Sequence, residues 1–310
     1  MGVFEHILSF QFVAMWLRVA TPLIFTSMGA VICEKSGVVN LGLEGIMLSS
    51  ALAGVMGSAF SGSLFVGVLT GMAMGLALSA VFAYFHLVLK ANAVLCGTAI
   101  NTFAGGFTVF MLEVTTGEKG NSSSLKSLAF GSWDIPVLKD IPFIGDLLSG
   151  HNVLTYMAFL MVGIIWYLLY KTPLGLRIRA VGENEDAINS VGISVKRVRF
   201  IAIMICGVMA SFGGMYLSMG YLNMFVRDMV AGRGFISLAA NAMGQATPIG
   251  TMLSALVFAF FDGLSNILQL LKIPSEFVQM LPYAATIAGL VAYSIQKTHS
   301  TRKKHGLVRV

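Results

Sequence analysis

Two ionisable side chains lie inside strongly apolar stretches of the sequence, Glu44 in "NLGLEG" and Asp262 in "FFDGLSN". If those stretches cross a membrane, each charge costs about 3 kcal/mol or more unless it is paired or hydrated, so a role on a solute or ion pathway is the first hypothesis. A structural role is the alternative, in which Glu44 caps a broken helix or bonds backbone groups freed by a turn at Gly42 and Gly45. Both interpretations stay open for Glu44, and a structural role at a helix end is favoured for Asp262.

Neutral amide side chains in the apolar stretches form a second group of candidates. Amides donate and accept hydrogen bonds, so they can contact a sugar hydroxyl or the edge of a base, and they can equally join two helices. Together with Glu44, the candidate pathway residues are Asn40, Asn101, Asn241, Gln245 and Asn266.

Catalytic chemistry finds no support in the sequence. The five histidines are scattered, and no His/Glu or Ser/His arrangement emerges. The chain contains no GxxxxGK[ST] phosphate-binding loop. Cys33, Cys96 and Cys206 stand singly, without the spacing of a metal site or a disulfide. We therefore expect no enzyme activity, catalytic residue, metal site or bound cofactor in this chain.

The composition is that of a polytopic membrane protein. Of 310 residues, 56% are apolar and only 11% are charged, and the mean hydropathy is +0.83, whereas about 25% of the residues in soluble domains are charged. The apolar runs are continuous and do not alternate with polar residues, which favours helices over a β-barrel. The sequence therefore predicts an all-α membrane protein with about eight to ten transmembrane helices.

Nine segments are the predicted elements of this bundle. Two of them, 41–57 and 235–246, are shorter than the ~20 residues that a crossing needs, so each is predicted to be a broken or re-entrant helix. The nine segments are 10–33, 41–57, 63–88, 94–112, 151–170, 198–222, 235–246, 249–271 and 278–296.

Basic residues predict the orientation of the chain. Segment 171–199 and the tail after residue 296 hold more than half of the 20 Lys and Arg residues, which places both in the cytoplasm by the positive-inside rule. We predict a cytoplasmic loop at 171–197, a cytoplasmic tail at 297–310 and no nucleic-acid binding, because a basic tail beside a span is a topology signal. Counting crossings then puts the N-terminus and segment 113–150 outside. This long outer segment could dock a binding protein or cover an outer gate, and a passive surface hairpin is the alternative.

The two short segments occur at matching places in the two halves of the sequence. In each half a long span, 10–33 or 198–222, precedes a polar turn, a short Asn-bearing helix and two further spans. One linking span, 151–170, offsets the halves by five crossings, and an odd offset inverts the second half relative to the first. Inverted repeats with interrupted helices are typical of transporters, whose pathway lies near the repeat interface.

A soluble-looking stretch, "AVGENEDAINSVGISVKRVRF" (180–200), interrupts the apolar pattern. It predicts a short helix with a capping residue, acidic residues in the first turn, one apolar face and a terminal glycine. A helix of ~10 residues is unstable alone in water, so its apolar face must pack on the chain's own bundle or in a groove on a partner. These features are, in order, Asn184, then Glu185 and Asp186, then Ala187, Ile188 and Val191, and finally Gly192.

Three motifs resemble a known family. "TPLGLRIRAVGENEDAINSVGISVKRVRF" resembles the cytoplasmic coupling loop of bacterial ABC importer permeases of the ribose and branched-chain amino acid type. "EKSGVVNLGLEGIMLSSAL" (34–52) and "GRGFISLAANAMGQATPIGTMLSALVFAFFDG" (232–263) are similar to motifs of the branch that transports nucleosides and related simple sugars. The resemblance implies a single permease domain over 1–310, a fold like that of the vitamin B12 type importers, and a multi-pass location in the bacterial cytoplasmic membrane.

The resemblance also implies partners and a function. Two permeases, this chain and a related but different one, would form the pathway over two ATPase subunits, and an extracytoplasmic binding lipoprotein would deliver the ligand. ATP and Mg would bind on the ATPase, and residues 183–192, from Glu183 to Gly192, would be the coupling helix. The implied substrates are nucleosides, purine nucleosides first, or related simple sugars. An ion-coupled secondary transporter of a small polar solute is the alternative, but it would normally place several charged residues at depth, and this chain has few.

Overall fold

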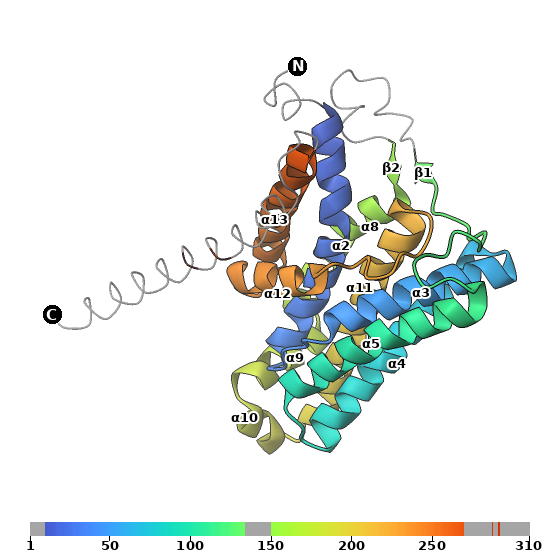
Figure 1. Ribbon diagram of the computed structural model, residues 1–310. Helices are drawn as coiled ribbons and strands as arrows, with labels where there is room; N and C mark the ends of the chain where they lie inside the picture. The colour runs from blue at the N-terminus through green and yellow to red at the C-terminus, as the bar shows by residue number, and fades with distance from the viewer. Residues whose placement is uncertain (1–9, 134–149, 270–286, 288–290, 292–310) are drawn as a thin grey trace.

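The computed structural model describes residues 10–133 and 150–269, together with the isolated residues 287 and 291. Figure 1 shows long helices in an inclined bundle, with one short helix, α12, lying across α2. The helices, in chain order, are α2 (Phe10–Lys35), α3 (Leu43–Ser61), α4 (Leu64–Ala83), the π-helical turn η1 (Tyr84–Val88), α5 (Ala93–Thr116), α8 (Val153–Lys171), α9 (Pro173–Glu183), α10 (Glu185–Ser190), α11 (Val195–Met215), the π-helical turn η2 (Tyr216–Tyr221), α12 (Arg233–Met243) and α13 (Pro248–Gln269).

Seven helices among the described residues are long and apolar enough to cross a membrane. They match seven of the nine predicted segments. The prediction of a broken or re-entrant helix at 41–57 is wrong, because α3 continues unbroken from Leu43 to Ser61, long enough to cross, and ends only at Gly62, whose φ of 65° is left-handed. Segment 235–246 corresponds to α12, which has 11 residues and is too short to cross alone. The predicted span 278–296 and the tail 297–310 lie outside the described residues.

The short helix α12 extends from the middle of the bundle toward one end of it. The chain before it, residues 222–232, forms a series of bends and turns after η2, and α12 then ends near the C-terminal end of α2, where Asn241 donates to Glu34. This arrangement agrees with the predicted broken helix at 235–246.

Small residues allow the central helices to approach closely. α2 packs against α8, α11, α12 and α13. A Cβ atom on Gly29 of α2 would lie 2.8 Å from the carbonyl oxygen of Cys206 in α11, and one on Gly45 of α3 would lie 2.8 Å from the carbonyl oxygen of Ile100 in α5. Dispersion and backbone contact at such points hold helices together where lipid removes the hydrophobic difference between inside and outside.

The described part of the outer segment 113–150 folds over one end of the bundle. Ser122 donates its N–H to the carbonyl oxygen of Phe225 (2.9 Å) and accepts from the N–H of Phe225 at its Oγ (2.8 Å). A two-stranded antiparallel sheet follows, in which β1 (Ser132–Trp133) pairs with β2 (His151–Asn152). These hydrogen bonds tie the segment to the loop after α11, so the described part is packed down on the bundle. Residues 134–149 lie outside the described residues.

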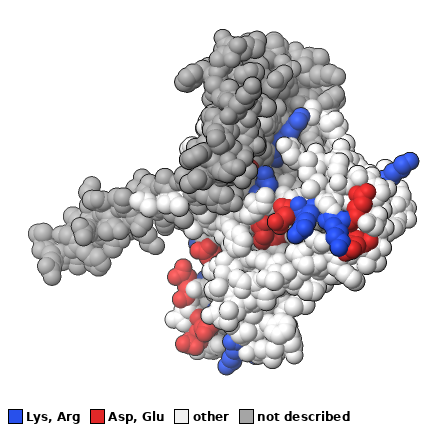
Figure 2. Space-filling model, viewed as in Figure 1, with Lys and Arg blue, Asp and Glu red and all other residues white. Residues whose placement is uncertain are grey.

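Charged side chains occupy two zones of the visible surface. In Figure 2 the largest group of Lys, Arg, Asp and Glu side chains runs from the centre of the face to the right at mid-height, a smaller group lies along the lower left edge, and uncharged surface separates the two groups. An uncharged surface between two charged zones suits a protein whose middle contacts lipid. Because α9 and α10 carry the basic loop 171–197, we call their end of the bundle the cytoplasmic end.

Candidate functional site: a polar junction inside the bundle and an exposed cytoplasmic segment

Glu44 joins the first turns of two helices from opposite halves of the chain. Its Oε1 accepts a hydrogen bond from the N–H of Gly232, and its Oε2 accepts one from the N–H of Gly234, each at 2.7 Å. The N-terminus of a helix has unpaired N–H groups and a partial positive charge, so a carboxylate there is favourable. A Cβ atom on Gly234 would lie only 2.6 Å from the backbone nitrogen of Glu44, so glycine is required for this approach. Glu44 therefore caps α12, which supports its structural interpretation, although the cap is on a distant helix.

Asn40 and Asn101 bond the backbone of the turn between α2 and α3. Asn101 donates its side-chain Nδ2–H to the carbonyl oxygen of Leu41 (2.9 Å) and accepts from the N–H of Gly45 (2.8 Å). Asn40 accepts from the N–H of Gly42 at 2.9 Å. Both amides thus pair backbone groups that the turn and the first turn of α3 leave without a helical partner. A contact to solute stays a prediction for both residues.

Asp262 pairs with Arg233 beside this junction. Oδ2 of Asp262 lies 3.3 Å from Nη2 of Arg233, and both side chains are about four-fifths buried. Arg233 also donates from Nη1 to the carbonyl oxygens of Met229 (3.3 Å) and Val230 (3.2 Å). The prediction of a helix-end position for Asp262 is wrong, because α13 continues to Gln269. The partner for its charge comes from the first residue of α12, which is 29 positions away in the sequence.

The remaining predicted pathway residues lie at two places in the second half. Asn241, buried in α12, donates to the carboxylate of Glu34 and accepts from the hydroxyl of Thr251 at 3.4 Å. Gln245 lies in the turn between α12 and α13 with a φ of +58° and lines a cavity. Asn266 belongs to α13, and its side chain is outside the described residues. Glu44, Asn40 and Asn101 are thus brought together, whereas Asn241 and Gln245 lie toward the cytoplasmic end.

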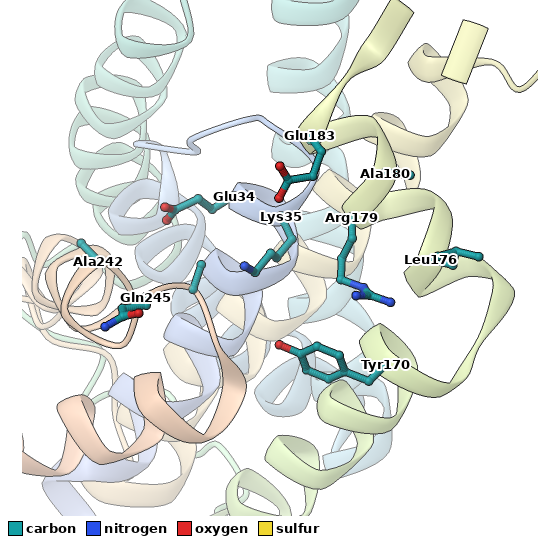
Figure 3. Close-up of a pocket in the computed structure, with 11 residues that line it drawn as sticks. Glu34, Lys35, Tyr170, Leu176, Arg179, Ala180, Glu183, Ala242 and Gln245 are labelled. Carbon is teal, nitrogen blue, oxygen red and sulfur yellow. The ribbon is translucent and has the colours of Figure 1, made fainter. Parts of the chain in front are cut away.

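A cavity of about 830 Å³ opens beside the C-terminal end of α2. Figure 3 shows that charged side chains from α2 and α9 project into the same space, and Tyr170 from α8 lies below Arg179. Arg179 is 5.1 Å from the centre of the Tyr170 ring, a cation–π distance, and its Nε–H donates to the carbonyl oxygen of Leu169 at 3.0 Å. The residues lining the cavity are Glu34, Lys35, Tyr170, Leu176, Arg179, Ala180, Gly182, Glu183, Ala242, Gln245 and Ala246.

Of the lining residues, sequence reasoning singled out Gln245 and Glu183 but assigned no role to the pair Glu34 and Lys35. The sequence did contain a signal for these two residues, because a charged pair at the end of an apolar run marks a helix end at the membrane surface. What the sequence did not reveal was the approach of α9 and the turn after α12 to that helix end.

The exposed segment 183–192 forms the predicted capped helix, α10, but in a shorter form. Asn184 accepts from the N–H of Ala187 at its Oδ1 (3.0 Å), and Gly192 has a left-handed φ of +79°. The helix has 6 residues, and residues 173–183 before it form a second helix, α9, in the predicted cytoplasmic loop, because Thr172 caps it and Pro173 occupies its first turn. The predicted cap and the terminal glycine are confirmed.

The apolar face of this segment is divided between two environments. Ile188 packs against the chain's own core, whereas Val191 is 68% exposed and Ala187 is exposed. Glu185 pairs with Arg199 of α11, Oε2 to Nη1, at 2.7 Å. The segment is therefore fixed on one side to the bundle and presents Asp186, Ala187 and Val191 outward.

The comparisons with known proteins decide the family. Residues 12–290 match the family described as "Branched-chain amino acid transport system / permease component". The chain belongs to this family. It is therefore a permease subunit of an ABC transporter and a multi-pass protein of the cytoplasmic membrane, as predicted.

Curated relatives cover nearly the whole chain. It is 36% identical to "Nucleoside ABC transporter permease protein NupC" of Lactococcus lactis subsp. cremoris (strain MG1363), over 91% of both chains. It is 37% identical to "Guanosine ABC transporter permease protein NupQ" of Bacillus subtilis (strain 168), over 88% of this chain and 89% of NupQ. "Nucleoside ABC transporter permease protein NupB", from the same Lactococcus strain as NupC, is 25% identical over 90% of this chain and 79% of NupB. One organism thus has two permeases that match this chain to different degrees.

A solved structure shares the fold. The chain resembles a subunit described as "An inward-facing conformation of a putative metal-chelate type ABC transporter", with a TM-score of 0.52 and 16% identity, over 93% of this chain and 88% of that one. This likeness confirms the predicted all-α importer-permease architecture and carries no information on the solute.

Proposed function

We propose that this chain forms one half of the pathway of an ATP-driven importer for nucleosides, purine nucleosides first and related simple sugars second. The observation that carries this proposal is the similarity, at 36% and 37% identity over about nine-tenths of the chain, to two permeases whose names specify a nucleoside and guanosine. The chain supplies the pathway and no catalytic residue, and ATP and Mg act on a partner ATPase.

The proposed contact with the ATPase is the segment 183–192. Among the described residues it is a short helix at the cytoplasmic end whose position is fixed by Asn184 and by the ion pair of Glu185 with Arg199, while Asp186 and Val191 point outward. A held, exposed helix can transmit a displacement of the ATPase to α9 and α11, the helices before and after it in the chain. We infer that closure of the ATPase pair moves these helices and so switches the pathway between its outward and inward states.

The proposed partner in the membrane is a second, different permease. Two permeases of one Lactococcus strain match this chain at 36% and 25% identity, which supports a pair of unlike subunits over two copies of one chain. An extracytoplasmic binding lipoprotein is the proposed source of the ligand. The described part of segment 113–150, which is packed over the outer end of the bundle, is the proposed surface for it.

Ion-coupled secondary transport receives little support from the polar groups of the bundle. A coupling carboxylate must be free to bind and release an ion. Among the described residues, Glu44 accepts two backbone hydrogen bonds, Asp262 pairs with Arg233, and Glu34 accepts from Asn241. Each carboxylate thus has a structural partner, which favours the ATP-driven mechanism.

The test of this proposal is uptake of a labelled purine nucleoside into vesicles that contain this chain, its neighbouring permease, the ATPase and the binding protein. We expect uptake that requires ATP and that unlabelled guanosine inhibits more strongly than ribose or glucose does. If only the simple sugars inhibited uptake, the substrate would be assigned as a simple sugar and not as a nucleoside. Uptake without ATP by this chain alone would replace the importer mechanism with secondary transport.

A further inference from the structure

A groove with an apolar floor and a basic end lies between η1 and the first turns of α11. Its volume is about 390 Å³, and Ala83, Tyr84, Leu87, Val88, Lys196, Arg197, Phe200 and Ile201 line it. Its apolar side chains face outward, with Tyr84 54% exposed, Val88 53% and Phe200 44%. A water-soluble protein would not leave such a groove open, but in a membrane protein it faces hydrocarbon or a neighbouring subunit.

The charged and apolar residues of this groove are ordered along the direction perpendicular to the membrane. α11 begins at Val195, directly after the cytoplasmic loop, so Lys196 and Arg197 lie in its first turn. Phe200 and Ile201 follow one turn deeper on the same face, because residues four apart lie above one another on a helix. The groove is therefore basic at the cytoplasmic surface of the bundle and apolar toward its middle.

The two basic side chains have no charged partner in the described part of the chain. Arg199, one turn farther along α11, forms an ion pair with Glu185 at 2.7 Å and donates its Nε–H to the carbonyl oxygen of Ser36 at 3.1 Å. Lys196 and Arg197 are exposed and have no ion pair within the ranges 10–133 and 150–269. None of the residues lining the groove is acidic. The groove thus carries a net positive charge for an anion to neutralise.

We propose that this groove binds one anionic phospholipid of the cytoplasmic leaflet. One acyl chain lies against Tyr84, Leu87, Phe200 and Ile201, and the phosphate and the anionic headgroup contact Lys196 and Arg197. The basic end and the apolar floor act together, since basic residues at the membrane surface attract anionic headgroups and the adjoining apolar groove holds an acyl chain of the same molecule. The lipid site does not depend on which solute is transported.

The test measures binding of individual lipids to the full-length chain by native mass spectrometry. The probes are phosphatidylglycerol and phosphatidylcholine with the same palmitoyl and oleoyl chains, titrated onto protein purified in a neutral detergent. We expect one saturable site that prefers phosphatidylglycerol. The double variant Lys196→Gln with Arg197→Gln should weaken phosphatidylglycerol binding roughly tenfold or more, since each basic residue near an anionic surface contributes a factor of about five. Its binding of phosphatidylcholine should not change.

Two further variants separate a site from general surface attraction. Lys171→Gln with Arg177→Gln removes the same charge from exposed cytoplasmic positions outside the groove and should leave the preference intact. Ile201→Trp fills the groove without changing its charge and should weaken the binding of both lipids several-fold. Ile164→Trp, at a similarly exposed position on α8 (43% against 40% for Ile201), is its matched control and should have no effect.

Several results would overturn the proposal. Equal loss of phosphatidylglycerol binding in the two charge variants would mean attraction to any basic surface. Unchanged binding in Ile201→Trp would exclude the groove. If the preference disappears once the second permease is bound, the groove is a contact between subunits and no lipid site. A preference that survives assembly, with the same pattern of variants, would support the proposal.

Discussion

The polar junction around Glu44 and the cytoplasmic segment 183–192 hold their polar groups in opposite ways. At the junction, Glu44 bonds the N–H groups of Gly232 and Gly234, which are 188 and 190 positions away in the sequence. In the segment, Asn184 bonds an N–H three positions away. The junction is enclosed by helices, whereas water reaches most of the segment.

This difference separates what holds the bundle together from what is available to a partner. A buried polar group without a partner costs the whole loss of its hydration, so the residues of the junction act on the stability of the bundle. An exposed cap or ion pair is screened and replaced by water, so the residues of the segment contribute little to stability. Substitutions in the first region should therefore change folding, and substitutions in the second should change the contact with the ATPase while the bundle stays intact.

The largest effect is expected at Glu44. Glu44→Ala leaves the N–H groups of Gly232 and Gly234 without acceptors, which should cost about 3 kcal/mol or more of folding free energy. This loss is measured by thermal melting in detergent, monitored through intrinsic fluorescence or the fluorescence of a thiol-reactive dye. Glu44→Gln keeps one carbonyl acceptor and should fall between the wild type and Glu44→Ala.

The control for Glu44 is Glu113→Ala. Glu113 is an exposed carboxylate that pairs with the exposed Lys119 at 3.1 Å. Its loss should barely change the melting temperature, because solvent screens exposed pairs. Equal melting temperatures for Glu44→Ala and Glu113→Ala would contradict the capping role of Glu44.

A smaller loss is expected at Asn101. Asn101→Leu removes one donor to Leu41 and one acceptor for Gly45, which should cost about 2 kcal/mol. The matched change Asn189→Leu falls on an exposed position of α10 and should stay within about 0.5 kcal/mol of the wild type. If the two variants had the same melting temperature, the contrast between the two regions would not hold for neutral amides.

Breaking the ion pair of Arg199 should act locally. Arg199→Gln removes the contact to Glu185, whose side chain is 52% exposed, and also the hydrogen bond to the carbonyl oxygen of Ser36, so the free energy of unfolding should fall by only about 1 kcal/mol. Hydrogen exchange should nevertheless speed up across α10, because the pair connects α10 to α11. The neighbouring variant Arg197→Gln removes the same charge but no ion pair among the described residues, and exchange in α10 should match the wild type. Faster exchange in both variants would show that charge alone matters.

The smallest effect is expected from the cap of α10. Asn184→Ala should cost about 1 kcal/mol of local helix stability. Exchange of the Ala187 amide should then rise about fivefold with no change in global melting. Protection of that amide that is unchanged from the wild type would mean that the cap seen at 3.0 Å is not maintained in solution.

Local patterns in the sequence were enough for the exposed segment and for most of the helices. Asn184 and Gly192 could be assigned from residue type and spacing alone, because both act on backbone within four positions. The same local reasoning did not identify α9, although Pro173 stands in its first turn, a position that favours proline.

For the junction, the sequence could predict that its charged side chains are paired, but not which residues pair with them. The sequence indicated that Glu44 and Asp262 needed partners, because charges in apolar stretches are costly. It could not identify Gly232, Gly234 and Arg233 as those partners, since the pairing depends on how the two halves pack. The cavity at Glu34 and Lys35 was missed for the same reason, because it is formed by the approach of α9 and of the turn after α12.

The central claim, that residues 183–192 connect this permease to its ATPase, is tested most directly by the double variant Asp186→Lys with Val191→Asp. Both side chains are exposed and neither supports the bundle through a side-chain hydrogen bond or ion pair among the described residues. The control, Glu118→Lys with Leu128→Asp, makes the same chemical changes at exposed positions of the outer loop.

The measurement is retention of the ATPase on the purified permease pair, together with ATP-dependent uptake of a labelled nucleoside in vesicles. We predict that the double variant inserts and melts like the wild type, but loses ATPase retention and uptake together, while the control keeps ATPase retention. Undiminished retention and uptake in the double variant would contradict the assignment of residues 183–192 as the coupling element.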